Sequence, residues 1–298
     1  MRVFPAGLNQ LVPTCTKVWR SGPVGFCILG CTKTIYRMEA LAKAGRWAFS
    51  ICLIGLAGQQ LYYSDLRPVF VPAWASPIPG HAFLAYLFSI ILIGSAATLF
   101  VGRGMRIAML FLGGLLFSLF LFSYAPFELF VDPKGMQIGS WNNALKELSF
   151  TGSAFIMAGT FSDMPGQGGW VSRVLVPVGR FFYSIMLVIF GIEHFLFGEF
   201  VRSLVPGWIP GDLFWTYFAA VALIGAGVAI IFRVKVELVA LLLGIMVFIW
   251  FLILHIPRAV VAPVTDQGNE LSSVFESLGV SGVAFVIAYG YRKGSKKF

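Results

Sequence analysis

Windows of about 20 apolar residues recur along this chain of 298 residues, and they constrain its fold more than any other feature. A helix needs about 20 such residues to cross a hydrocarbon core about 30 Å thick. Hydrophobic residues make up 58% of the chain and charged residues 12%, against about 25% charged residues in a soluble domain. We therefore predict an all-α membrane protein in contact with the lipid bilayer, with eight transmembrane helices near 46 to 64, 82 to 101, 106 to 124, 142 to 161, 180 to 198, 213 to 232, 235 to 255 and 271 to 290.

Basic residues fall mostly on one side of these spans. With both termini on that side, all of the 22 basic residues lie there except Arg67, Lys134, Lys146, Arg202 and Arg258. Cytoplasmic connections carry the excess of Lys and Arg, so we expect an integral protein of a bacterial inner membrane with both termini cytoplasmic. The net charge of +9 mostly reflects this topology, and we expect no nucleic-acid partner.

The cysteines are Cys15, Cys27, Cys31 and Cys52, all near the N-terminus, and they predict no disulfide framework. FCILGC resembles a lipoprotein cleavage box, but cleavage there would place the new terminus outside, against the charge pattern. We expect residues 1 to 44 to form a cytoplasmic or interfacial arm. Met38 is an alternative start, because it opens MEALAKAGRW directly before the first span.

The chain also contains an internal repeat. GRWAFSICLIGLAGQQLYYSD, from Gly45, aligns with GRFFYSIMLVIFGIEHFLFGE, from Gly179, and the register continues until Pro126 meets Pro257. Each copy holds four predicted spans, so both copies share one orientation. We predict two tandem four-helix bundles, at 45 to 163 and 179 to 291, joined by a Gly/Pro linker at 164 to 178 and followed by a basic tail at 292 to 298.

Ionisable side chains occur inside several predicted spans. Glu193 and His194 stand side by side in FGIEHFLFGEF, and His255 and Glu276 lie at similar depth in the last two spans, counting about 1.5 Å per helical residue. Such a residue costs about 2.5 to 3.5 kcal/mol in hydrocarbon, so packing or function must compensate for it. We take these four residues as candidate catalytic residues.

The first copy departs from this pattern. Gln59 and Gln60 replace Glu193 and His194, and Tyr124 replaces His255, so the second copy is the better candidate for chemistry. Glu147 and Glu276 stand at matching places in this alignment, which favours a shared structural role for them.

Three interpretations of the Glu193 and His194 pair stay open. The pair could hydrogen-bond neighbouring helices and fix the packing of the bundle. A histidine beside a carboxylate titrates near neutral pH and could pass protons to a quinone. His194 and His255 could also bind a metal, but they lack the Glu-x-x-His spacing of bundle metal sites, so we predict none.

An aromatic loop, VPGWIPGDLFW, lies over the polar layer of the second copy. Trp and Tyr favour the headgroup level, so Trp208, Trp215 and Tyr217 could be simple anchors. The other interpretation is that the loop covers a pocket that opens sideways to lipid, as a hydrophobic quinone would require. In that case Trp208, Trp215 and Tyr217 bind the quinone as a cofactor.

Several segments resemble the DoxX-like integral membrane family, which includes the small membrane subunit of thiosulfate:quinone oxidoreductase. They are the Gly-Arg opening of the first span, GIEHFLFGEFV, the VPGWIPG loop, FWTY and WNNALKELSFTGSAFIMAG. The resemblance covers about 45 to 290, twice over. The resemblance implies a redox partner chain, soluble or membrane-bound. The sequence itself has no Walker, Rossmann or CxxC motif, so any substrate oxidation would also need such a partner.

We therefore expect a membrane subunit that docks a redox partner and supports quinone-linked electron or proton transfer, with Glu193, His194, His255 and Glu276 lining the site. The alternative is a non-enzymatic scaffold or cargo-binding membrane protein whose polar layer only packs the bundle. A small-molecule permease is a weaker alternative, because parallel repeats alone say little about transport.

Overall fold

The structure is a computed structural model of the chain, and it describes residues 24–72, 79–135, 137–161 and 169–294. Within these ranges the chain is helical and contains no strand. The chain divides into two compact units, Met1–Met38 and Glu39–Phe298. Everything that builds the candidate site belongs to the second unit. Much of the predicted arm, part of the linker and tail, and Trp74 lie outside the described residues.

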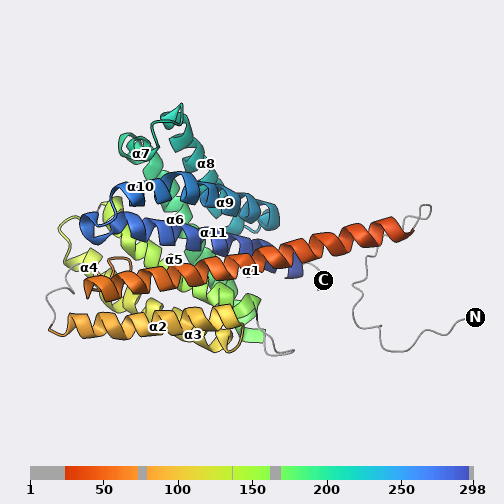
Figure 1. The fold of residues 1–298 in the computed structure, drawn as a ribbon, viewed down its shortest axis with the longest axis horizontal. Coiled ribbons are helices and arrows are strands. Elements are labelled where there is room, and N and C mark those ends of the chain that lie inside the picture. The colour runs from red at the N-terminus through yellow and green to blue at the C-terminus, as the bar shows by residue number, and fades with distance from the viewer. Residues whose placement is uncertain (1–23, 73–78, 136, 162–168, 295–298) are drawn as a thin grey trace, which may run out of the picture. The chain divides into compact units, whose positions relative to one another are not determined.

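The helices follow one another with short connections (Figure 1). The first half contains α1 (Val24–Tyr63), α2 (His81–Val101), α3 (Met105–Leu119), a π-helical turn (Phe120–Tyr124), α4 (Ala125–Phe130), a 3₁₀ turn (Ile138–Trp141) and α5 (Asn142–Thr160). The second half contains a π-helical turn (Val171–Leu175), α6 (Val176–Leu196), α7 (Gly198–Leu204), α8 (Asp212–Ile231), α9 (Val236–Trp250), a π-helical turn (Phe251–His255), α10 (Ile256–Val261), a 3₁₀ turn (Thr265–Gln267) and α11 (Asn269–Gly294).

The predicted fold class, an all-α membrane protein, is confirmed. In the described part of the chain, seven helical stretches are long and apolar enough to cross a membrane: Met38–Tyr63, His81–Val101, Met105–Phe130, Val171–Leu196, Asp212–Ile231, Val236–Val261 and Thr265–Arg292. The fourth predicted span, near 142 to 161, corresponds to α5, which is less apolar and is not among these seven.

The physical reason is the position of α5. From Glu147 to Ala158 every residue of α5 is buried inside the protein. A helix covered by its neighbours needs no lipid-facing apolar residues, so it can carry small and polar side chains instead.

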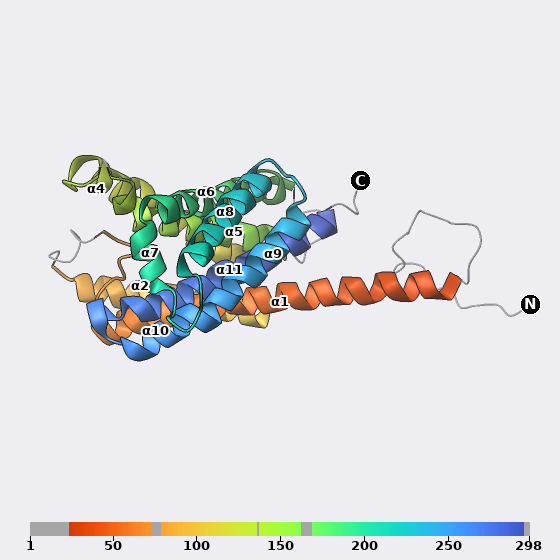
Figure 2. The ribbon, with the colours of Figure 1, turned by 90° about the horizontal axis from the view of Figure 1, so that it is seen from above.

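Four helices form the centre of the protein, namely α5 and α11 with α1 and α6 against them (Figures 1 and 2). Lys146 meets Glu276 near one end of α5 and α11, and Phe161 stacks on Tyr289 near the other, so these two helices run in parallel. The outer helices pack against this centre, α3 against α5 and α9 against α11.

Glycines set the closest contacts of the central helices. A Cβ added to Gly152 of α5 would lie 2.4 Å from the Gly179 carbonyl oxygen of α6, and one on Gly282 of α11 would lie 2.5 Å from that of Gly45 in α1. These distances are too short for any side chain, so the helix backbones touch. The first helix of each half thus packs on the last helix of the other half.

The two halves also share unusual backbone features. The π-helical turns Phe120–Tyr124 and Phe251–His255 each come directly before a short helix with proline in its first turn. Gly80 and Gly211 precede α2 and α8 with φ of 84° and 76°. A π-helical turn and a positive φ are both uncommon, so their recurrence at matching positions indicates one four-helix plan used twice.

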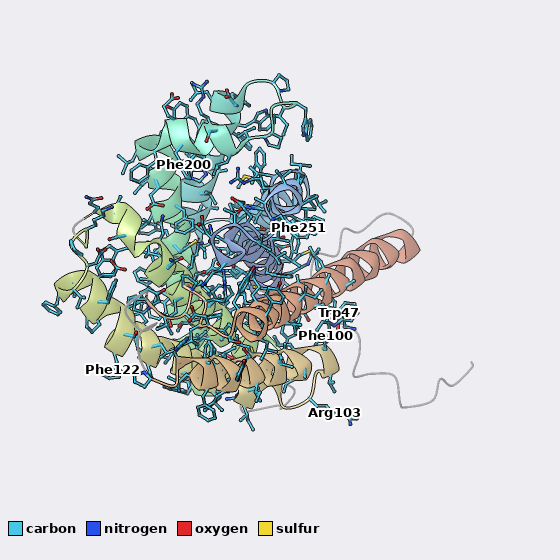
Figure 3. All side chains as sticks on the ribbon, turned by 60° about the vertical axis from the view of Figure 1, so that its left-hand side comes forward. Trp47, Phe100, Arg103, Phe122, Phe200 and Phe251 are labelled. Carbon is cyan, nitrogen blue, oxygen red and sulfur yellow. The ribbon has the colours of Figure 1, made fainter. Side chains whose placement is uncertain are left out.

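Large aromatic and aliphatic side chains cover the outside of the bundle. Figure 3 shows Trp47, Phe100, Phe122 and Phe200 on the outer surface, and Phe122 is 80% exposed. An aqueous surface would not carry so many exposed apolar groups, whereas a hydrocarbon environment accommodates them.

Candidate functional site

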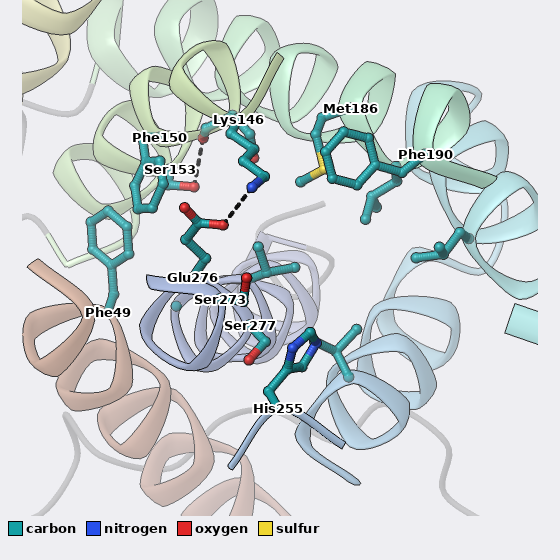
Figure 4. A pocket seen from close by; sticks show the side chains of 16 residues that line it. Phe49, Lys146, Phe150, Ser153, Met186, Phe190, His255, Ser273, Glu276 and Ser277 are labelled. Carbon is teal, nitrogen blue, oxygen red and sulfur yellow. Dashed lines mark hydrogen bonds and ion pairs between the residues drawn. The ribbon is translucent and has the colours of Figure 1, made fainter. Parts of the chain in front are cut away.

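A cavity of about 240 Å³ lies where α5 of the first half and α11 of the second half face α6, α8 and α9 of the second half (Figure 4). Its wall is mostly apolar, with Met186, Leu187 and Phe190 on the α6 side. Polar groups come almost entirely from α5, α11 and the π-helical turn after α9. They are Lys146, Ser149, Ser153, His255, Ser273, Glu276 and Ser277.

An ion pair crosses the cavity wall. Lys146 Nζ of α5 lies 2.8 Å from Glu276 Oε2 of α11, and the side chains are only 23% and 11% exposed (Figure 4). Lys146 also lies within the electrostatic reach of Glu193. A largely desolvated pair of this kind needs good geometry, because removing two charges from water costs several kcal/mol per ion.

The glycine contacts show that Lys146 and Glu276 occupy equivalent positions. Gly152 and Gly282 make the same backbone contact in the two halves, and counting back six residues from each reaches Lys146 and Glu276. The sequence alignment had matched Glu276 with Glu147, and this match is wrong by one residue. The ion pair therefore joins matching positions of the two halves across their pseudo-twofold axis.

His255 stands at the end of a π-helical turn and lines the cavity near Ser277 (Figure 4). Its Nδ1 atom is buried and has no hydrogen-bond partner among the residues that the structure describes. Glu276 is the strongest electrostatic neighbour of the ring. Because π-helical turns concentrate at functional positions and buried polar atoms are normally paired, His255 is the clearest candidate for contacting a bound molecule.

Residue sizes differ between the two halves at some positions around the cavity. In the first half, four matching positions are at most 2% exposed, and they are Leu56, Leu92, Leu116 and Tyr124. Their counterparts in the second half line the cavity, and they are Phe190, Leu223, Val247 and His255. Two phenylalanines of the first half contact Phe70, with ring centroids 5.1 Å away for Phe88 and 5.8 Å away for Phe150. The second half has the smaller Ala219 and Val280 at the places of Phe88 and Phe150, and Val280 lines the cavity.

Glu193 and His194 lie outside the cavity wall. Glu193 is buried against α5, where Asn142, with its amide oriented to suit both groups, donates to the two carboxylate oxygens at 2.6 and 2.8 Å. His194 is half-buried, and its Nδ1 lies 2.7 Å from the Phe190 carbonyl oxygen of its own helix. The two side chains thus point to different neighbours, as their 100° separation on a helix requires.

The first half has a matching polar contact. Gln59, the counterpart of Glu193, accepts a hydrogen bond from Ser272 at 2.9 Å, and Ser272 is the counterpart of Asn142. Gln59 also donates to the Gly268 carbonyl oxygen at 2.9 Å. Both contacts join one half to the other, so these buried polar groups contribute to the interface between the halves.

The aromatic loop leads to a second, larger hollow. Trp208 and Trp215 line an apolar groove of about 780 Å³ between α8 and α9, together with Trp250. Tyr217 lies outside this groove and stacks on Phe195, with ring centroids 5.3 Å apart. Both the groove and the cavity are lined by residues of α8 and α9. On α8, Ala222 lines the groove and the next residue, Leu223, lines the cavity.

Lys146 is the site residue that the sequence analysis missed. The charge pattern places Lys146 on the outward side of the membrane, and in the structure it supplies the cation of the cavity. Aligning GSAFIMAG with GVAFVIAYG would have placed it opposite Glu276. Across the described residues, no three His, Cys, Asp or Glu side chains gather closely enough to hold a metal ion.

Comparisons with protein-family models, with curated proteins and with solved structures found no match. The resemblance to the DoxX-like family therefore stays a prediction from the sequence motifs.

Proposed function

We propose that this chain is a DoxX-like membrane subunit whose cavity binds the ring of a quinone and exchanges protons with it, while a partner oxidoreductase supplies or removes the electrons. The observation that carries this proposal is the combination of an unpartnered His255, the Lys146–Glu276 ion pair and an otherwise apolar wall in one cavity. Ligand sites of this kind bury an apolar body and fix its orientation with a few polar groups.

Reduction of one quinone to a quinol takes two electrons from the partner oxidoreductase and two protons at the quinone oxygens. His255 is suited to donate a hydrogen bond to one oxygen, and Lys146 to the other. Each can pass a proton during reduction, and Glu276 can hold one, because all three side chains line the cavity.

The size of the cavity suits one ring rather than a whole long-tailed molecule. We propose that the apolar tail lies in the groove between α8 and α9, along Trp208 and Trp215. We also propose that both termini are cytoplasmic and that the membrane is a bacterial inner membrane, on the distribution of Lys and Arg.

The test is the binding of a short-tail benzoquinone to the purified protein, measured by equilibrium dialysis. Val280→Phe restores the bulk of the first half at the cavity wall and should abolish binding, whereas Ala222→Phe places the same ring in the outer groove and should leave it intact. His255→Leu should weaken binding by about 10- to 100-fold, the loss expected when one hydrogen bond in an apolar site is removed. Equal binding by the wild type and Val280→Phe would refute the proposed site.

One observation favours the alternative of a non-enzymatic scaffold. The polar contacts Gln59–Ser272, Glu193–Asn142 and Lys146–Glu276 all join the two halves. A scaffold needs only this interface between the halves. Under this alternative, variants of Lys146 and Glu276 should lose stability, and the wild type should bind no quinone.

A further inference from the structure

The turn between α8 and α9 carries two cations at unusual backbone positions. Arg233 and Lys235 have φ of 60° and 45°, in the left-handed region that residues with a Cβ rarely adopt. The matching turn of the first half, between α2 and α3, has glycine at both places, with φ of 80° at Gly102 and 67° at Gly104. Glycine adopts this conformation without steric strain, whereas any other side chain costs free energy there. The second half thus holds two strained cations in a turn that the first half builds with glycine.

The distribution of charge across the membrane does not require cations at these two positions. A cation in the middle of the turn serves that distribution equally well, and the first half has Arg103 there. Lys235 also directly precedes α9, at the positive end of the helix dipole, where an anion is favourable and a cation is not. Backbone strain of this kind, without a gain in stability, indicates a function.

A third cation stands beside the turn. In the first half the guanidinium group of Arg46 packs against Gly102, and its Nη1 atom lies 3.4 Å from the place of a Cβ on that glycine. Arg180 and Arg233 occupy these two places in the second half, and Arg233 lies within the electrostatic reach of Arg180. The Arg180 Cζ atom lies 4.6 Å from the centre of the Tyr291 ring, which fixes this guanidinium group at the end of α6. Two cations therefore adjoin where the first half has one cation and a glycine.

These cations have no anionic partner among the residues that the structure describes. Arg180, Arg233 and Lys235 belong to none of the ion pairs within the described ranges. The carboxylate closest to Lys235 in the sequence, that of Glu237, pairs instead with Arg292 of α11 at 2.8 Å. An anion from outside the chain would reduce the repulsion among the three cations.

The surroundings of the turn favour a lipid as the source of that anion. The side chains of Arg233 and Lys235 are exposed, and Val234 between them is 56% exposed. Phe232 and Leu238, on either side of the turn, are 72% and 55% exposed. Cations next to exposed apolar side chains match a phospholipid, in which a phosphate group adjoins the acyl chains.

We propose that Arg233 and Lys235, with Arg180 beside them, bind the phosphate group of an anionic phospholipid in the leaflet at the C-terminal end of α11. The acyl chains then lie along the exposed apolar side chains next to the turn. Arg180, Arg233 and Lys235 line neither the quinone cavity nor the groove, so this inference does not rest on the proposed function.

The test is the binding of tritiated phosphatidylglycerol to the immobilised full-length protein in maltoside micelles, with zwitterionic phosphatidylcholine as the comparison. The wild type should prefer phosphatidylglycerol. Arg233→Gly and Lys235→Gly should each lower the affinity for phosphatidylglycerol about fivefold, and the double variant about 25-fold, because each removes one cation from the headgroup. The two glycines recreate the turn of the first half, so the double variant without lipid should unfold at a temperature no lower than the wild type.

Matched controls each remove one positive charge elsewhere. Arg103→Gln changes the exposed cation in the matching turn of the first half, and Lys134→Gln changes an exposed cation in the connection after α4. Neither should change the affinity for phosphatidylglycerol more than about twofold. Arg233→Asn and Lys235→Asn keep the test decisive if the glycine variants do not fold, because asparagine tolerates the left-handed conformation.

Unchanged binding of phosphatidylglycerol by the double variant would overturn the site. An equal loss of affinity in Arg103→Gln would overturn it too, since attraction by net charge alone would then explain the binding. Inorganic phosphate at millimolar concentration, compared with chloride at the same ionic strength, distinguishes the source of the phosphate group. Displacement of phosphatidylglycerol from the wild type by phosphate but not by chloride would refute the assignment to a lipid.

Discussion

Exchanging the charges of Lys146 and Glu276 should preserve the protein, although each single reversal should damage it. The two residues occupy equivalent positions of the two halves, so their surroundings are similar and the swapped pair can adopt the same geometry. Lys146→Glu alone places two carboxylates at the axis, and Glu276→Lys alone places two ammonium groups there.

The structure sets the magnitude. At 2.8 Å and an effective dielectric constant of about 20, the attraction of the pair is about 6 kcal/mol before desolvation is subtracted. Breaking a fully buried pair costs about 3 to 5 kcal/mol, and the residual exposure of 23% and 11% places this one near the lower end. We therefore expect each single reversal to destabilise the protein by about 3 kcal/mol, and the double reversal by about 1 kcal/mol.

The assay is reversible unfolding in mixed micelles, followed by circular dichroism, for the wild type, both single variants and the double variant. Glu199→Ala serves as the control, since its ion pair with Arg202 is exposed and should contribute nothing measurable. If the double reversal is as unstable as the two single effects added together, the two positions are not equivalent and the pseudo-twofold placement is wrong.

Two further predictions concern the interface between the halves. Gly282→Ala should destabilise the protein by about 2 to 4 kcal/mol in the same unfolding assay, because its Cβ would lie 2.5 Å from the Gly45 carbonyl oxygen. Gly114→Ala is the control. Its Cβ would meet no atom within 4 Å, so this variant should be neutral or slightly stabilising. Arg67→Met should lower the free energy of unfolding by about 2 to 4 kcal/mol, because the buried guanidinium donates to the Gln267 carbonyl oxygen and the Ser272 hydroxyl at 2.8 Å each. A decrease smaller than about 0.5 kcal/mol would contradict this role. Burial lowers the pKa of Arg67, which identifies the desolvation that these hydrogen bonds offset.

Sequence reasoning predicted most of the fold. Apolar windows long enough to cross a membrane predicted the helices. The motif match between Gly45 and Gly179 predicted two tandem copies. The window near 142 to 161 predicted the helix α5 but not its enclosure, because a helix surrounded by other helices has no hydropathy requirement of its own. Its Gly, Ser and Ala residues are the informative signal, because small side chains permit close helix packing.

The site was predicted only in part. His255 and Glu276 do line one cavity, but Glu193 and His194 belong to helix contacts beside it. Adjacent helical residues cannot share one neighbour, so sequence proximity was a poor guide to the site. The cavity wall includes positions where side-chain size differs between the halves, such as Val280 for Phe150, which no motif records.

The ion pair on the axis also bears on how such a protein could have arisen. In a symmetric dimer of identical four-helix chains, equivalent residues meet at the twofold axis, so a lysine there would face a lysine and a glutamate a glutamate. Lys146 facing Glu276 requires two different sequences at the same structural position. Joining both copies in one polypeptide permits this, because each position on the axis can then change by itself. A single chain with two different copies can therefore form a charged contact on the axis that a symmetric dimer of identical chains cannot form.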